Sequence, residues 1–308
     1  MAYDIKNKLV VAVASSALFD LTESDEIYKT KGVKEYEAYQ NENINNVLKQ
    51  GVAFPFIQRL LSLNEIDETN NPIEVILLSR NSAETGLRVF RSISEYNLNI
   101  SRAAFFSGSS PYKYIPAYNA SLFLSANEKD VIEAIRLGYP AGQVLGNGAA
   151  NFNDDQEFRI AFDFDGVIAS DEAEVIYKEG GIKMYHEYEK THSNRPLNIG
   201  PVGTLLKKIS ALQEAERIYA SQNTNYQPKL KTSIVTARNA PAHERVITTL
   251  KHLGIKVDEA FFMGGVDKKS VLNIMQPHIF FDDQKTHLEN LENIPAVHIP
   301  FGIANQKQ

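Results

Sequence analysis

Two pairs of aspartates, each placed after an apolar segment, have the types and spacing needed for chemistry on a phosphate ester. Asp163 and Asp165 follow one apolar run and lead into a tight turn with Gly166. Asp282 and Asp283 follow a second apolar run more than a hundred residues later. One carboxylate can attack phosphorus, another can transfer a proton, and the remaining ones can hold a hard cation. The two pairs therefore predict a site for metal-assisted phosphoryl transfer.

A hydroxyl and an ammonium group lie between the two pairs and would bind the phosphoryl oxygens. Thr236 ends an apolar run, and Lys268 is favoured as the cation over Lys269, which we interpret as its surface neighbour. Ala237 and Arg238 follow Thr236 and would contact the substrate. For Arg238 a structural salt bridge is the competing interpretation, because an arginine also occupies the equivalent place earlier in the chain.

Each carboxylate has a distinct predicted role. Asp163 comes first at the strand end, so it would be the nucleophile that forms an aspartyl phosphate. Asp165 would protonate the leaving alkoxide and later activate water. Mg²⁺ prefers oxygen ligands, and it would be held by Asp163, the carbonyl of Asp165, Asp282 and Asp283.

Strands that alternate with helices predict an α/β fold with a mainly parallel sheet, in which ligands bind beyond the carboxyl ends of the strands. The strands expected in the second half are 159–164, 231–236, 259–263, 278–282 and 295–299. Helices are expected around 204–213 and from about 240 to 253, and residues 171–203 would form a small helical cap. Tyr185 and Tyr188 in this cap could stack on a base, but Tyr36 and Tyr39 occupy the equivalent first-half positions, so core packing is favoured.

The chain repeats itself, which indicates two halves: residues 1–150 and residues 151–308. Residues 32–36 match residues 181–185, an offset of 149. Further on, residues 77–81 match 235–239, and residues 122–126 match 279–283. We interpret this as a duplicated α/β unit joined by the polar segment 147–156. Chance resemblance between parallel strands is the alternative.

The two halves differ at the positions that would carry the chemistry. Ala14 and Ser16 stand where the second half has its first pair of aspartates, and Ser125 and Ala126 stand where it has the second pair. Leu78 replaces the hydroxyl of the second half. The first half is therefore predicted to be degenerate, and residues 151–308 to be catalytic.

The bulk composition narrows the class of protein. The chain has 308 residues, a formal net charge of -6 and no cysteine. Its charge argues against a partner such as a nucleic-acid polymer or an anionic membrane, and cysteine-based zinc sites and thiolate nucleophiles are excluded. No apolar run approaches the roughly 20 residues of a membrane helix. Residues 1–6 lack the apolar core of a signal peptide, so a cytoplasmic location is expected.

These residues resemble a known superfamily of enzymes. Asp163-x-Asp165, Thr236, Lys268 and Asp282-Asp283 are similar, in order, to the four motifs of the haloacid-dehalogenase-like (HAD) phosphatases. Over nearly its whole length the chain also resembles the cytosolic 5′-nucleotidase type I family. The stretches that carry this second resemblance are 12–19, 53–56, 122–126, 170–172, 235–238 and 277–284.

The resemblance implies HAD-like Rossmannoid sheets and Mg²⁺-dependent hydrolysis of nucleoside 5′-monophosphates, typically AMP-like, to nucleoside and phosphate. It also implies a cytosolic homo-oligomer that nucleoside diphosphates activate. One departure is Phe164, which stands between the two aspartates where the animal members have glycine. Two alternatives stay open: a HAD-type phosphatase of sugar phosphates, and a nucleotide-sensing protein without turnover, which the intact second-half site disfavours.

Overall fold

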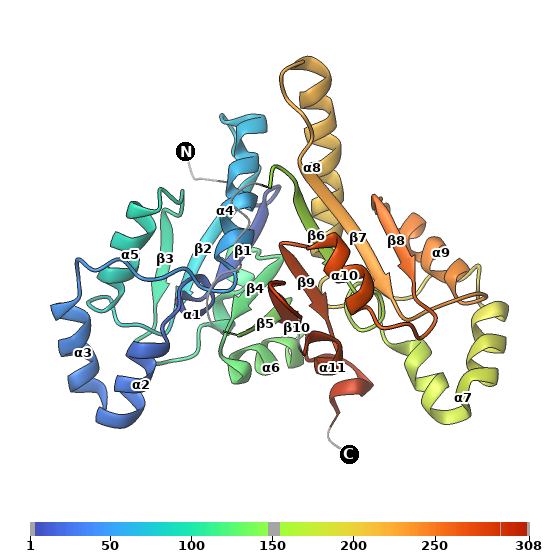
Figure 1. Ribbon diagram of the computed structural model, residues 1–308, viewed down its shortest axis with the longest axis horizontal. Coiled ribbons are helices and arrows are strands. Elements are labelled where there is room, and N and C mark those ends of the chain that lie inside the picture. Colours follow the sequence, from blue (N-terminus) through green and yellow to red (C-terminus); the bar gives the residue numbers. More distant parts are fainter. Residues whose placement is uncertain (1–3, 147–154, 290, 307–308) are drawn as a thin grey trace. The chain divides into compact units, whose positions relative to one another are not determined.

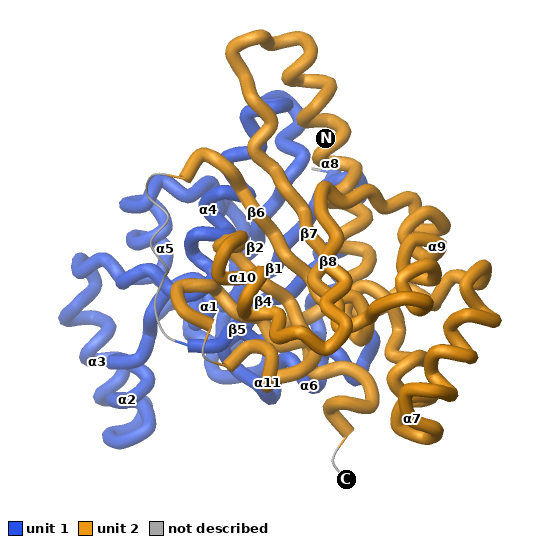
Figure 2. Tube along the Cα trace, turned by 45° about the vertical axis from the view of Figure 1, so that its right-hand side comes forward, with its two compact units in different colours: residues 1–139, 143–151 blue, residues 140–142, 152–308 orange. Residues whose placement is uncertain are grey.

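A computed structural model describes residues 4–146, 155–289 and 291–306 (Figure 1). Contacts divide the chain into two compact units (Figure 2). Unit 1 comprises residues 1–139 and 143–151, and unit 2 comprises residues 140–142 and 152–308. The predicted boundary between 150 and 151 and most of the predicted linker (147–154) lie outside the described residues.

Unit 1 contains a parallel sheet with the strand order β3-β2-β1-β4. Its strands are β1 (Leu9–Val13), β2 (Ile73–Ser79), β3 (Arg102–Phe105) and β4 (Leu122–Ser125). A further strand, β5 (Ala141–Leu145), has residues in both units. Every residue of β1 and β2 is buried, as expected for parallel strands covered on both faces.

Two helices of unit 1 form a hairpin beyond the first strand, visible in Figure 1. The helices of this unit are α1 (Ser15–Leu18), α2 (Thr22–Lys31), α3 (Val33–Glu42), α4 (Phe54–Ser62), α5 (Gly86–Glu95) and α6 (Glu128–Arg136). The chain reverses between α2 and α3 at Gly32, whose φ of 91° favours glycine.

Unit 2 contains a parallel sheet with the order β10-β9-β6-β7-β8, so its last four strands repeat the order found in unit 1. Its strands are β6 (Phe158–Phe162), β7 (Leu230–Thr236), β8 (Glu259–Phe262), β9 (Ile279–Asp282) and β10 (Ala296–His298). All five predicted strands are confirmed, with ends that agree within two residues. In the register, Phe162 pairs with Ile234 on one side and Phe281 on the other, which brings three strand ends together.

The three helical regions predicted for unit 2 are found, although one helix is longer than expected, and two further short helices were not predicted. The helices of this unit are α7 (Glu172–Thr191), α8 (Gly203–Gln222), α9 (His243–Leu253), α10 (Lys269–Met275) and α11 (Lys285–Leu288). The expected end of α8 near residue 213 is wrong: the helix continues to Gln222, beyond the apolar stripe on which the expectation relied. The α/β class and the mainly parallel sheets are confirmed.

The segment α7 lies within the predicted cap, 171–203, and has the form of a hairpin (Figure 1). It turns at Gly181, which has a φ of 68° and matches Gly32 of the other unit. In each unit an arginine guanidinium packs over the ring of a tyrosine in the hairpin. The Cζ atom of Arg88 lies 5.6 Å from the ring centre of Tyr39, and that of Arg245 lies 5.6 Å from the ring centre of Tyr188. A common ancestry of the two units stays a prediction.

Candidate active site

The side chain of Asp163 stands at the carboxyl end of β6 and is 5% exposed. Its N–H donates to the carbonyl of Phe281 on β9 at 2.8 Å, so the sheet register fixes its backbone. The next N–H, that of Phe164, donates to Asp163 Oδ1 at 2.7 Å. One carboxylate oxygen is thus held by the turn, and the other faces the lysine described next.

Lys268 supplies a buried cation between two carboxylates. Its Nζ lies 2.8 Å from Asp163 Oδ2 and 2.7 Å from Asp282 Oδ2. Burial raises the pKa of Asp163 to about 7, and the nearby Lys268 only partly opposes this rise. Burial would lower the pKa of Lys268, but Asp163 and Asp282 raise it above its ordinary value, so the ammonium stays charged. Of the two lysines considered, Lys268 is the one that reaches these carboxylates.

A histidine that the sequence analysis did not select also contacts Asp282. Nδ1 of His287, on α11, lies 3.1 Å from both carboxylate oxygens of Asp282. Burial alone would raise the pKa of Asp282, but Lys268 and His287 hold it below its ordinary value. Ligand atoms of Asp163, Asp282 and His287 lie within 4.8 Å of one another, a spacing suited to a metal ion. This group shares two members with the predicted metal ligands.

Asp283 has buried oxygens with no hydrogen-bond partner among the described residues. Burial, followed by the charges of Asp163 and Asp282, raises its pKa to about 10. The turn after β6 passes close to it: a Cβ on Gly166, whose φ is 70°, would lie 2.6 Å from Asp283 Oδ2. The position therefore requires glycine both for its backbone and for the room that Asp283 occupies.

The second aspartate of the first pair is held by the predicted arginine. Arg238 Nε and Nη2 donate to Oδ2 and Oδ1 of Asp165, each at 2.7 Å. The guanidinium also lies 5.5 Å from the ring centre of Phe164, which is fully buried. The salt bridge considered for Arg238 is present, and its contact with a substrate stays a prediction.

A buried glutamate connects this arginine to the cap. Glu189, on α7, pairs with Arg238 through one oxygen and with Arg245 Nη1 at 2.9 Å through the other. Arg245 in turn pairs with Glu172 at the start of α7, also at 2.9 Å. These alternating charges tie both ends of α7 to the site. The sequence analysis missed Glu189, because its two partners are distant in the chain.

Thr236 ends β7 at the same edge of the sheet and is 1% exposed. Its Oγ1 accepts a hydrogen bond from the N–H of Arg238 at 3.2 Å, and Ala237 between them is exposed. From the cap, Tyr185 lies edge to face with Tyr177, their ring centres 6.1 Å apart. Burial raises the pKa of Tyr185, and the charges of Arg238 and Asp165 also act on it. Tyr185 therefore lies close enough to the site for these charges to act on it. The core-packing interpretation of this tyrosine did not include such a position.

No helix among the described residues is long and apolar enough to cross a membrane. The sequence model of the 5′-nucleotidase family matches residues 1–306. Human cytosolic 5′-nucleotidase 1B is 32% identical over 298 residues, which are 95% of this chain and 48% of that protein. This chain thus spans about half the length of that curated relative.

Among solved structures, a chain of the Pnkp1/Rnl/Hen1 complex is similar over 95% of this chain and 96% of its own length. Its identity is 14% and its TM-score is 0.31, which is too low to indicate a shared fold. The match over residues 1–306 and the human relative carry the assignment. On that basis the chain belongs to the 5′-nucleotidase family.

Proposed function

We propose that this chain hydrolyses nucleoside 5′-monophosphates of the AMP type to nucleoside and phosphate, with Asp163 as nucleophile. The observation that carries the proposal is the buried contact between Asp163 and Lys268 at the carboxyl end of β6, 2.8 Å long. A nucleophile fixed beside a cation suits attack on an anionic phosphoryl group. Membership of the 5′-nucleotidase family supports the same reaction.

The reaction would proceed in two steps. A carboxylate oxygen of Asp163 forms a bond to phosphorus while the bond from phosphorus to the ribose 5′-oxygen breaks, and Asp165 gives a proton to that oxygen. In the second step Asp165 takes a proton from water, and the water oxygen displaces Asp163 to release phosphate. Thr236 and Lys268 would bind the phosphoryl oxygens, and Ala237 and Arg238 would complete the substrate contacts.

The residues at the site fit a divalent cation. Both oxygens of Asp283 are buried acceptors without a donor among the described residues, as expected of a metal ligand. Asp163, the carbonyl of Asp165, Asp282 and Asp283 would hold Mg²⁺, and His287 lies close enough to contribute or to orient Asp282. The ion would neutralise negative charge on the carboxylates and the phosphoryl group.

The same proposal includes a degenerate first half, residues 1–150, a catalytic second half, residues 151–308, and a homo-oligomer in the cytoplasm. The assignment of a degenerate first half is supported by the residues that stand there in place of the catalytic aspartates, which are Ala14, Ser16, Ser125 and Ala126. The human relative is named cytosolic, which supports the location.

The test is phosphate release from AMP, IMP, GMP, CMP, UMP, their deoxy forms and several sugar phosphates, each with Mg²⁺ and with EDTA. We expect Mg²⁺-dependent release that favours nucleoside monophosphates. A preference for sugar phosphates would replace this proposal with the sugar-phosphatase alternative. If the folded protein released no phosphate from any compound of the panel, the nucleotide-sensing alternative would be favoured.

A further inference from the structure

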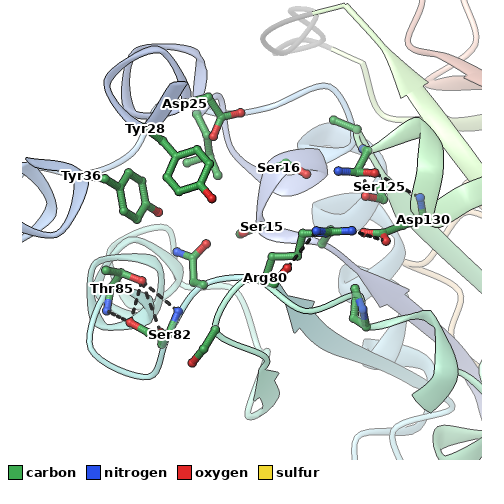
Figure 3. A pocket seen from close by; sticks show the side chains of 18 of the residues that line it. Ser15, Ser16, Asp25, Tyr28, Tyr36, Arg80, Ser82, Thr85, Ser125 and Asp130 are labelled. Carbon is green, nitrogen blue, oxygen red and sulfur yellow. Dashed lines mark hydrogen bonds and ion pairs between the residues drawn. The ribbon is translucent and has the colours of Figure 1, made fainter. Parts of the chain in front are cut away.

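A pocket of about 500 Å³ lies in unit 1 at the carboxyl ends of its strands (Figure 3). Ser15 follows β1, Arg80 follows β2 and Ser125 ends β4, and all three line it. Its size lies within the range of pockets that take small molecules, roughly 300–1,000 Å³. Carboxyl ends of parallel strands are also where α/β sheets bind ligands.

This pocket occupies the position that the proposed active site has in unit 2, but its chemistry is different. The four residues that match the aspartates of unit 2 all line the pocket; they are Ala14, Ser16, Ser125 and Ala126. None of these side chains can attack phosphorus as a carboxylate or hold a divalent cation by charge. The carboxylates found elsewhere in the lining do not belong to the group of ligand atoms, among the described residues, that is spaced for a metal ion. The pocket therefore suits a ligand that is bound without a metal ion and is not hydrolysed.

A pair of tyrosine rings packed edge to face occurs at matching positions in both units. In unit 1 the rings of Tyr28 and Tyr36 are 5.8 Å apart at 83°. In unit 2 the matching rings of Tyr177 and Tyr185 are 6.1 Å apart at 88°. Figure 3 shows Tyr28 and Tyr36 together on one side of the pocket, across from Ser15 and Arg80. Such rings can stack on a flat aromatic ligand, and Tyr28 is 52% exposed and thus accessible.

Hydroxyl groups form much of the remaining lining. The Ser and Thr residues that contribute them are Ser15, Ser16, Ser82, Thr85, Ser107 and Ser125. Four of these hydroxyls already make one hydrogen bond or more within the protein; they belong to Ser15, Ser82, Thr85 and Ser125. A hydroxyl both donates and accepts and has two lone pairs, so the lining can still offer bonds to the hydroxyls of a ribose and the polar edge of a base.

The charges of the pocket disfavour a phosphate group. Arg80 donates to both oxygens of Asp130, at 2.7 and 2.6 Å, and also to the Gly108 carbonyl and Ser110 Oγ, so its guanidinium is already engaged. Three carboxylates line the pocket, those of Asp25, Glu37 and Asp130, against two cations, Lys29 and Arg80. A ligand with a negative charge would meet excess negative charge here.

We propose that the pocket of unit 1 binds an uncharged nucleoside, without a metal ion and without turnover. The choice of a nucleoside rests on the proposed function, because Tyr177 and Tyr185 beside the proposed active site would meet the base of the substrate. A nucleoside is also the product of the proposed reaction. Unit 1 would thus keep recognition of the base and ribose while lacking the groups that act on the phosphate.

Calorimetric titration of the full chain in EDTA with adenosine, guanosine, cytidine and uridine tests the proposal. We expect at least one of them to bind in a way that depends on Tyr28. Tyr28→Ala should weaken this binding by about tenfold or more through the lost stacking, whereas the control Tyr219→Ala, on α8 and outside both sites, should leave it within about twofold. Ser16→Phe, which adds a bulky ring to the lining of the pocket, should give the same loss as Tyr28→Ala and serves as the second variant if Tyr28→Ala does not fold.

Three results would overturn the proposal: no binding of any of the four nucleosides, loss of binding in Tyr177→Ala but not in Tyr28→Ala, or tighter Tyr28-dependent binding of AMP or ADP than of the nucleoside. Failure of the proposed function would appear separately, as a lack of phosphate release from nucleoside monophosphates by the wild-type chain with Mg²⁺.

Discussion

The ammonium of Lys268 contacts the carboxylate of Asp163 at 2.8 Å, and both side chains are almost completely buried. The same ammonium contacts Asp282, so a single lysine balances two carboxylates that come from different strand ends. A buried pair of this kind is costly to break from one side, because the remaining charge has no solvent to stabilise it. Lys268 therefore links the stability of the site to its proposed chemistry.

Replacement of this lysine should affect both properties. Lys268→Met is expected to lower phosphate release by about 100-fold or more, because it removes a charge that faces the phosphoryl group. It should also lower the free energy of unfolding by about 3–5 kcal/mol. Lys269→Met is the matched control, since Lys269 is the adjacent, half-buried lysine. Loss of activity in Lys269→Met with retention in Lys268→Met would contradict the assignment.

Asp283 gives a prediction for stability as a function of pH. Its pKa of about 10 in the folded chain is far above the ordinary value of 3.8, so its ionisation opposes folding as pH rises above about 4. Asn resembles the protonated form. In EDTA, Asp283→Asn should therefore match the wild type near pH 4 and exceed its free energy of unfolding by about 2–5 kcal/mol at pH 8.

Denaturant unfolding at both pH values measures this difference. Mg²⁺ should stabilise the wild type more than Asp283→Asn, because the variant lacks one proposed ligand. If Asp283→Asn were less stable than the wild type at pH 8 in EDTA, the ionised carboxylate of Asp283 would not destabilise the metal-free protein, and the prediction would be wrong.

The two bonds from Arg238 to Asp165 predict coupled effects on catalysis. Arg238→Gln and Asp165→Asn should each lower kcat. Arg238→Gln removes the two bonds that orient the carboxylate of Asp165, and Asp165→Asn removes that carboxylate itself. The double variant should be about as impaired as the worse single variant, because both changes act on one unit. Fully multiplicative losses in kcat would instead assign Arg238 a separate contact with the substrate.

Tyr185 gives a prediction for the choice of substrate. Tyr185→Ala should raise KM for the preferred nucleoside monophosphate by about tenfold while leaving turnover of ribose 5-phosphate unchanged, because only the nucleotide offers a base for stacking. Steady-state kinetics on both substrates measures this, with Tyr219→Ala as a control on α8. Equal losses on both substrates would mean that Tyr185 stabilises the fold of the cap and does not stack on the base.

The strands and the residues at their ends could be predicted from the sequence, because buried parallel strands are apolar runs and the chemistry sits where they end. Asp163, Thr236 and Asp282 are all found at the ends of such runs. The sequence favoured Lys268 over Lys269 without showing what either lysine contacts, and the structure supplies the contacts of Lys268 with the two carboxylates.

Other features depend on partners that are distant in the chain. Glu189 lies between Arg238 and Arg245, and neither pairing can be read from spacing. The extension of α8 to Gln222 has a similar cause, since Glu216 is buried and accepts hydrogen bonds from the N–H groups of Lys229 and Leu230 at the start of β7. A long-range contact thus supports a helical segment that has no apolar stripe.

The most direct test of the central claim is to trap the phosphorylated enzyme. Wild-type protein mixed with AMP labelled in its phosphate and with Mg²⁺ is quenched in acid, and the labelled peptide is identified by mass spectrometry. We predict an acid-stable label on Asp163, absent in Asp163→Asn, which should fold normally and release no phosphate. Phosphate release by Asp163→Asn at the wild-type rate, or a label on another residue, would contradict the proposed mechanism.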